Sequence, residues 1–336
     1  MWKPTDPALF FSRQDPDDRR LGDLVRPYDV AQDSLSFAEG RRTFVVGGYP
    51  DDEGIRLNGG RPGAALAPAS IRKPFYKMTP ALQEVADFDL FDAGDLDIAN
   101  GGRAGAVGLG ARHAEGSRVC TEVLSRGARW IGLGGGHDYG FSEAKGFIDW
   151  ARTQKVKPLV INFDAHFDVR PTTGGFSSGT PFYRLLEASA VGGGETLFDF
   201  AELGIQAQCN SQKHFQWLKD RGARVLTMED VEASGETFEI CAARLLEDWI
   251  LRPRPTFLSI DIDAFSSAVA PGCSQSWATG FMPSDFFPLF DLLLRRLDVR
   301  ALGIYETSPP LDQDDRTSKL AALIMHRYVT RAGKIS

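Results

Sequence analysis

The chain has 336 residues, of which 43% are hydrophobic and 25% charged, which is typical of one large globular domain with a buried core. Its formal net charge of −7 and the lack of a basic stripe argue against a nucleic acid or an anionic membrane as partner. No apolar run approaches the roughly 18 residues of a membrane span, and Lys3, Asp6 and Arg13 interrupt the apolar residues near the N-terminus, so we expect no secretory signal. The four cysteines are scattered without a CxxC pair, which favours a reduced, cytoplasmic protein.

Residues 1–42 are polar without sustained periodicity, and we expect them to be an N-terminal extension packed on a single domain that spans 43–336. Beyond them, strand patterns alternate with helix patterns. The predicted strands are 43–47, 90–96, 130–133, 159–163, 196–200, 224–227, 256–262 and 301–305. The predicted helices are 114–126, 140–154, 180–189, 210–221, 236–251, 283–296 and 316–331, with Asn210 and Ser284 as N-caps. This alternation predicts an α/β fold with a mostly parallel, eight-stranded sheet covered by helices on both faces.

One predicted strand leads directly into metal-binding side chains. The apolar run 159–163 is followed by Asp164, His166 and Asp168 at every second position. Alternate residues of an extended strand share a face, so the three side chains should point the same way. Two carboxylates and an imidazole that converge in a poorly hydrated place require a cation between them, which predicts a metal site.

Two further strand ends carry the same chemistry. The strand at 130–133 runs through three glycines into His137, and the strand at 256–262 ends in Asp261 and Asp263. Carboxyl ends of parallel strands meet at one edge of the sheet, where ligands bind. One divalent ion cannot use four carboxylates and two imidazoles without a large excess of negative charge, so the set predicts two ions with bridging carboxylates. Its oxygen-rich, thiolate-free character favours Mn²⁺, with iron and zinc as alternatives.

The three motifs together resemble those of the arginase/ureohydrolase superfamily, with the similarity running from about residue 43 to 331. They read Gly135-Gly136-His137, Asp164-Ala165-His166-Phe167-Asp168 and Ser259-Ile260-Asp261-Ile262-Asp263. The resemblance implies a three-layer αβα fold and a dimanganese centre. It also implies that Asp164 and Asp261 bridge the ions, that His137 and Asp168 complete one shell, and that His166 and Asp263 complete the other.

Details favour one branch of this superfamily, the formimidoylglutamases. Where arginases and agmatinases carry a histidine after the Asp-x-His-x-Asp motif, this chain reads Ser177-Ser178-Gly179-Thr180-Pro181-Phe182, which is similar to formimidoylglutamases. The segment from Tyr305 to Asp312 resembles the family segment whose glutamate faces the amidine-type nitrogen of the substrate, which makes Glu306 its counterpart.

The expected reaction is hydrolysis of the formimino C–N bond of N-formimino-L-glutamate, giving L-glutamate and formamide. Hydroxide shared by two cations would be the nucleophile. Glu306 would orient the amidinium, and Asp168 would carry a proton to the departing amine. Arg170 is the first candidate for binding a substrate carboxylate, and Ser177 and Asn210 are further candidates for polar contacts.

The sequence is also compatible with other functions. The nearest is another ureohydrolase, such as an arginase, agmatinase or guanidino-acid hydrolase, which would release urea. A deacetylase of related fold would hold one zinc ion, and a metal-binding protein without catalysis would turn over no amidine. Relatives are commonly rings of identical subunits, so we expect a homo-oligomer. Cys273, in the loop after Asp263, is a candidate for a redox role.

Overall fold

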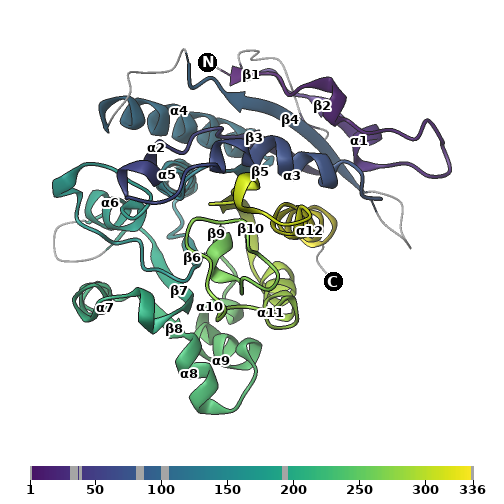
Figure 1. Cartoon of the computed structure of the whole chain (residues 1–336). Coiled ribbons are helices and arrows are strands. Elements are labelled where there is room, and N and C mark those ends of the chain that lie inside the picture. Colours follow the sequence, from purple (N-terminus) through teal and green to yellow (C-terminus); the bar gives the residue numbers. More distant parts are fainter. Residues whose placement is uncertain are drawn as a thin grey trace.

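A ten-stranded sheet runs through the middle of the molecule, with helices on both of its faces (Figure 1). The structure, a computed structural model, describes residues 2–30, 37, 40–80, 87–99, 106–190 and 196–333. The strands lie in the order β1-β4-β3-β5-β10-β9-β6-β7-β8, and β2 pairs with β4. All neighbouring pairs are parallel except β1 with β4. The predicted α/β fold is therefore confirmed, with a mixed, mostly parallel sheet.

The eight predicted strands correspond to β3–β10, whose neighbouring pairs are all parallel. The strands are β1 (Trp2–Lys3), β2 (Val25–Pro27), β3 (Arg42–Gly48), β4 (Phe88–Leu96), β5 (Arg129–Leu133), β6 (Leu159–Phe163), β7 (Asp199–Ile205), β8 (Arg224–Thr227), β9 (Pro255–Asp261) and β10 (Asp298–Tyr305). The sequence pattern did not predict β1 and β2, which add the N-terminal segment to the sheet edge at β4.

The helices match their predicted positions less uniformly. They are α1 (Leu21–Leu24), α2 (Glu53–Leu57), α3 (Ala67–Phe75), α4 (Ala106–Ser125), α5 (Asp138–Thr153), α6 (Pro181–Ala188), α7 (Gln212–Lys219), α8 (Met228–Ser234), α9 (Phe238–Leu245), α10 (Glu247–Leu251), α11 (Pro283–Arg296) and α12 (Arg316–Arg331). The single helix predicted over 236–251 is two, because Leu246 leaves helical geometry at φ −104° and ψ 12°. The two predicted N-caps were wrong: Ser211 caps α7, and Met282 precedes α11.

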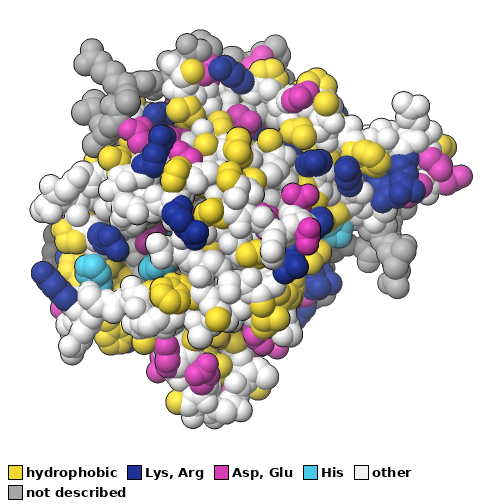
Figure 2. Space-filling view, viewed as in Figure 1, with side chains coloured by type: hydrophobic (Ala, Val, Ile, Leu, Met, Phe, Trp, Pro, Cys, Tyr) yellow, Lys and Arg dark blue, Asp and Glu magenta, His cyan; other side chains and the backbone are white. Residues whose placement is uncertain are grey.

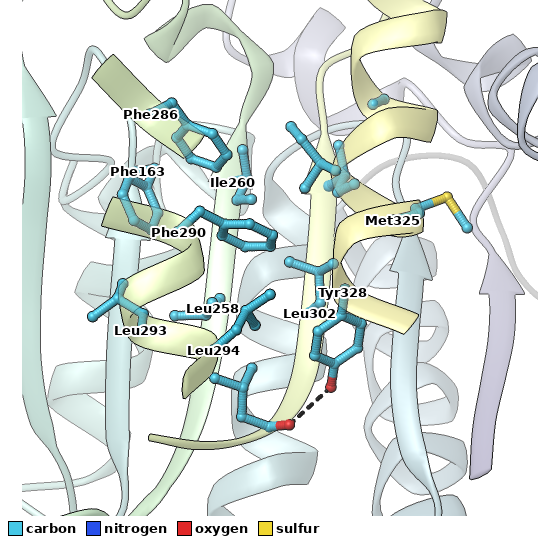
Figure 3. Packing of buried hydrophobic residues seen from close by; sticks show 14 of the residues in the cluster. Phe163, Leu258, Ile260, Phe286, Phe290, Leu293, Leu294, Leu302, Met325 and Tyr328 are labelled. Atoms are coloured by element: carbon cyan, nitrogen blue, oxygen red, sulfur yellow. Dashed lines mark hydrogen bonds between the residues drawn. The ribbon is translucent and has the colours of Figure 1, made fainter. Parts of the chain in front are cut away.

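Apolar residues line both faces of the central strands, which explains the three layers. In β3, Phe44 and Val46 belong to one core cluster and Val45 to the other. The first cluster lies under α11 and α12, where Phe286 and Phe290 pack over β6 and β9 and Tyr328 donates a hydrogen bond to the Val299 carbonyl (Figure 3). Burial on both faces leaves the carboxyl edge of the sheet as the place where polar side chains gather.

No helix in the described part of the chain combines the length and apolarity needed to cross a bilayer. On the face shown in Figure 2, basic and acidic side chains are interspersed.

Candidate metal centre

Four neighbouring strands deliver the predicted site residues to one edge of the sheet. The order β5-β10-β9-β6 places four strand ends side by side. His137 follows β5, Glu306 follows β10, Asp261 ends β9 and Asp164 follows β6. Residues separated by as many as 169 positions in sequence therefore meet, as the backbone N–H of His137 donating to Glu306 Oε1 at 3.0 Å demonstrates.

The local backbone differs from the extended strand that the alternation predicted. β6 ends at Phe163, so Asp164, His166 and Asp168 lie in the following loop, and Asp168 adopts a left-handed conformation with φ 49°. Asp263 likewise lies in a 3₁₀ turn rather than in β9. Backbone hydrogen bonds to carboxylates shape these loops: His166 N donates to Asp164 Oδ1 at 2.7 Å, and Asp263 N donates to Asp261 Oδ1 at 2.9 Å. The side chains converge because of turns, not because of strand periodicity.

The six predicted ligands form two groups that share Asp164. In the first group, His137 Nδ1 lies 3.0 Å from Asp164 Oδ2, 3.0 Å from Asp168 Oδ2 and 3.2 Å from Asp261 Oδ2. In the second, His166 Nδ1 lies 3.1 Å from Asp263 Oδ2 and 3.6 Å from Asp164 Oδ1. Each oxygen of Asp164 thus faces a different histidine, which is the arrangement that a bridging carboxylate requires. Asp261 falls in the first group alone.

The chemistry of this donor set fits divalent cations. His137 Nδ1 is buried without a hydrogen-bond partner, although three carboxylate oxygens surround it, and His137 Nε2 is 2.8 Å from the Ser259 hydroxyl. If Nε2–H donates to Ser259 and the imidazole is neutral, the Nδ1 lone pair points at carboxylates, and a metal cation between them makes this arrangement favourable. Burial alone would lower the pKa of His137, yet Asp164, Asp168 and Asp261 raise it well above its usual range. The cluster therefore attracts positive charge strongly.

Two further buried polar residues, Asn162 and Glu202, are connected to Asp164 by hydrogen bonds. Asn162 Nδ2 donates to Asp164 Oδ2 at 3.2 Å and to Glu202 Oε2 at 2.8 Å. Glu202 is fully buried, and burial together with the nearby Asp164 charge raises its pKa well above the usual range. Nothing in the sequence pattern singled out this glutamate, which lies within β7 and pairs across the sheet with Asn162.

A cavity of about 450 Å³ opens onto the two groups. Four predicted ligands line it, His166, Asp168, Asp261 and Asp263, and so does Glu306. Glu306 is 6% exposed, and burial raises its pKa well above the usual range. A volume of this size suits a small molecule.

The predicted substrate-binding residues occupy different positions around this cavity. Arg170 is exposed at its wall, with Nη1 3.2 Å from Asn58 Oδ1. Asn210 lines it too, but its side-chain amide already bonds Phe167 N, Ala165 O and Gln206 O, so it holds the loop in place.

Ser177 is not among the residues that line the cavity. Its hydroxyl lies 3.5 Å from Asn58 Oδ1, and the neighbouring Ser178 lines the cavity instead.

Sequence reasoning missed several residues of the cavity wall, among them Asn58 and His214. Asn58 contacts both Arg170 and Ser178, and it belongs to a glycine-rich stretch that could have signalled a binding loop. His214, which has no metal-ligand spacing in the sequence, lines the cavity from the first turn of α7. Burial and the nearby Arg170 charge lower its pKa. The four cysteines are free thiols, and Cys209 also lines the cavity, whereas Cys273 is buried.

A family model and curated relatives both place this chain among arginase-family proteins. The family model described as "Arginase family" matches residues 42–330. Formimidoylglutamase from Aeromonas hydrophila is 30% identical over 328 residues, which cover 98% of this chain and 99% of that protein. Formimidoylglutamase from Aeromonas salmonicida is 32% identical, with 95% and 96% covered.

Solved structures of arginase-family proteins superpose on this chain. Formiminoglutamase from Trypanosoma cruzi, in a structure with two Mn²⁺ ions, superposes with a TM-score of 0.76 at 28% identity, covering 95% of this chain and 100% of that one. Formimidoylglutamase from Bacillus subtilis shares the fold, with a TM-score of 0.78 at 24% identity and coverage of 95% and 93%. The motifs, the fold and the full-length similarity together show that this chain belongs to the arginase family.

Proposed function

We propose that this chain is a formimidoylglutamase, which holds two Mn²⁺ ions and hydrolyses N-formimino-L-glutamate to L-glutamate and formamide. The observation that carries the proposal is the pair of ligand groups sharing Asp164 beside a cavity that is also lined by Glu306 and Arg170. Relatives at about 30% identity over their full length carry the same name.

His137, Asp164, Asp168 and Asp261 would hold one ion, and Asp164, His166 and Asp263 the other. When bound, two divalent ions lower the pKa of water and polarise the group under attack. The donors are two imidazoles and carboxylate oxygens, with no thiolate among the six, and such a set favours manganese, with iron and zinc as alternatives.

The chain's own residues would bind and orient the substrate. The formimino end is cationic and the glutamate end carries two carboxylates, so the substrate has opposite charges at its two ends. Glu306 is buried beside the ligands and would pair with the amidinium, while Arg170 at the exposed wall would bind a carboxylate. These two contacts would hold the formimino carbon beside the ligand groups. Part of the entropy cost of bringing the reacting atoms together is then covered by substrate binding.

Asp168 is the residue placed to move a proton. It belongs to the first ligand group and also lines the cavity, so it would lie next to both the nucleophile and the leaving amine. It would take the proton from the hydroxyl that has added to the formimino carbon and pass it to the departing nitrogen, so that the C–N bond breaks with glutamate leaving as a neutral amine rather than as an anion.

A substrate panel tests this proposal. The Mn²⁺-loaded protein is incubated separately with formiminoglutamate, arginine, agmatine and guanidinobutyrate, and formamide, urea and the amine products are quantified. We expect formamide and glutamate from formiminoglutamate, and little urea from the other three, because Ser178 stands in the segment where arginases and agmatinases carry a histidine. Urea as the main product would replace this proposal with another ureohydrolase activity. No metal-dependent turnover of any of them would overturn it.

A further inference from the structure

A buried carboxylate that plays no part in the proposed reaction is linked to the metal centre through Tyr305, whose ring stacks on His137. Glu143 is on α5, six residues after His137, and it is completely buried. Its Oε2 accepts a hydrogen bond from the Tyr305 hydroxyl and its Oε1 accepts one from Trp130 Nε1. Burying a carboxyl group in a helix–sheet interface is costly, and an apolar side chain of similar size would avoid that cost.

Glycines in the sheet leave the space that the Glu143 carboxylate and the Tyr305 ring occupy. A Cβ atom on Gly132 of β5 would lie 1.6 Å from Glu143 Oε1, and one on Gly303 of β10 would lie 1.9 Å from the Tyr305 hydroxyl and 2.4 Å from Glu143 Oε2. Gly134 is equally constrained, since its Cβ would lie 2.3 Å from the Tyr305 ring. Glycine within strands weakens them, so these glycines, two inside strands and one just beyond β5, mark a place where close approach matters more than strand stability.

Tyr305 connects this buried carboxylate to the site. Its ring stacks on the His137 imidazole, with centroids 4.8 Å apart and planes inclined by 24°. Tyr305 is also the last residue of β10 and directly precedes Glu306, whose backbone has a φ of 64°. The position of one phenol ring therefore bears on both a ligand and the residue that faces the amidinium.

Stacking on Tyr305 fixes the plane of the His137 imidazole ring, which the other contacts of His137 do not fix by themselves. The Ser259 hydroxyl holds Nε2, and Phe182 meets the ring edge-on at 5.4 Å, but the face of the imidazole rests on Tyr305. The direction of the Nδ1 lone pair toward Asp164, Asp168 and Asp261 follows from the plane of the ring. Groups that orient metal-binding histidines from behind tune metal affinity and activity.

We propose that Glu143 is a positioning residue, which holds Tyr305 in place and through it sets the plane of His137 and the backbone at Glu306. The inference rests on the metal-binding role of His137 in the proposed function, but not on the identity of the substrate. Glu143 and Tyr305 touch no reacting atom, so their main effect is expected in metal affinity and kcat, with a smaller effect on KM through Glu306.

The chain contains a matched control for this idea. Tyr76 is also fully buried, and its hydroxyl donates to a buried carboxylate, Asp92, which also binds Arg72. This second cluster involves α3 and β4 and lines no part of the cavity. Tyr305→Phe and Tyr76→Phe each remove one buried hydroxyl and keep the ring, so a purely structural role predicts similar consequences for both.

The experiment compares these two variants and Glu143→Gln with the unsubstituted full chain. Mn²⁺ binding is measured by calorimetry on metal-stripped protein, and kcat and KM are measured with formiminoglutamate. We expect both Tyr→Phe variants to lower the Tm by a few degrees. Only Tyr305→Phe should weaken the affinity for one of the two ions by about 10- to 100-fold and lower kcat by a similar factor, with KM changed less than twofold.

Glu143→Gln keeps the size of the side chain and decides the case if Tyr305→Phe fails to fold. If Glu143 and Tyr305 act as one unit, the double variant should lose no more affinity or kcat than the worse single variant. The inference is overturned if Glu143→Gln, or a folded Tyr305→Phe, binds two ions and turns over substrate within twofold of the unsubstituted chain. If the unsubstituted chain itself binds no Mn²⁺, the proposed function fails, and the inference fails with it.

Discussion

Replacing Asp164 with Asn should abolish binding of both metal ions, whereas replacing Asp168 should affect only one. Asp164 is fully buried and belongs to both ligand groups, with Oδ2 3.0 Å from His137 Nδ1 and Oδ1 3.6 Å from His166 Nδ1. Asp168 belongs to the first group alone. The two substitutions remove the same charge from nearly the same place, and they differ in how many ligand groups each carboxylate belongs to.

The size of the effect follows from the lost charge. A pair of unit charges about 4 Å apart interacts by about 4 kcal/mol at the effective dielectric constant of a protein site. A loss of that size corresponds to about a 1,000-fold weaker affinity, and a divalent ion raises it further. Asp164→Asn should therefore weaken binding of each ion by about 1,000-fold or more.

The assay is calorimetric titration of metal-stripped protein with Mn²⁺, together with far-UV circular dichroism to verify the fold. We expect two ions for the unsubstituted chain, one for Asp168→Asn and none for Asp164→Asn at concentrations that saturate the unsubstituted chain. Asp298→Asn, on β10 and outside both groups, serves as a control that keeps both ions. The reasoning is refuted if Asp164→Asn still binds two ions within tenfold of the original affinity, or if it behaves like Asp168→Asn.

Three further predictions concern substrate binding, pH and metal removal. Arg170→Ala should raise KM for formiminoglutamate about 10- to 100-fold without changing Mn²⁺ content, because one charge-assisted contact is lost. The control Arg118→Ala, on α4, should leave KM unchanged. An unchanged KM in Arg170→Ala would contradict the assignment of Arg170 to substrate binding. Burial raises the pKa of the Glu143 carboxyl from 4.5 to about 7. Between these pH values the carboxyl is protonated in the folded chain and ionised in the unfolded chain. The raised pKa therefore contributes about 3 kcal/mol of stability below pH 4.5, and this contribution is lost as the pH rises through 7. Glu143→Gln should therefore gain in stability relative to the unsubstituted chain between pH 5 and pH 8 in urea unfolding of metal-stripped protein, and a difference independent of pH would disprove the shift. Chelation of Mn²⁺ should lower the Tm by several degrees, since saturation at 100 times Kd contributes about 2.7 kcal/mol per ion, and a Tm unaffected by chelator would contradict tight binding.

Much of the sheet was predictable because apolar runs and the residues that end them are local signals. The strands β6 and β8 have the predicted bounds, and the glycines before His137 correctly marked the end of β5. β7 was placed too early, because Glu202 in its middle looks polar, and only its pairing with Asn162 across the sheet makes burial favourable.

The site was predictable in its ligand types but not in its geometry. Metal-binding residue types after three strands pointed to one edge, yet the alternation argument assumed extended strands where the chain turns. Which residues form the cavity wall depends on how loops distant in sequence come together. Asn58, which precedes Arg170 by 112 residues, and His214 on α7 therefore carried no local signal that linked them to the ligands.

The central claim is that buried acidic and imidazole groups from three strand ends are held together by a pair of divalent ions. Anomalous diffraction at the manganese edge, from crystals of the full chain grown with Mn²⁺, tests this most directly. The structure predicts two adjacent peaks, one among His137, Asp164, Asp168 and Asp261 and the other among Asp164, His166 and Asp263. A single peak, or none at these side chains in the presence of saturating Mn²⁺, would contradict the account.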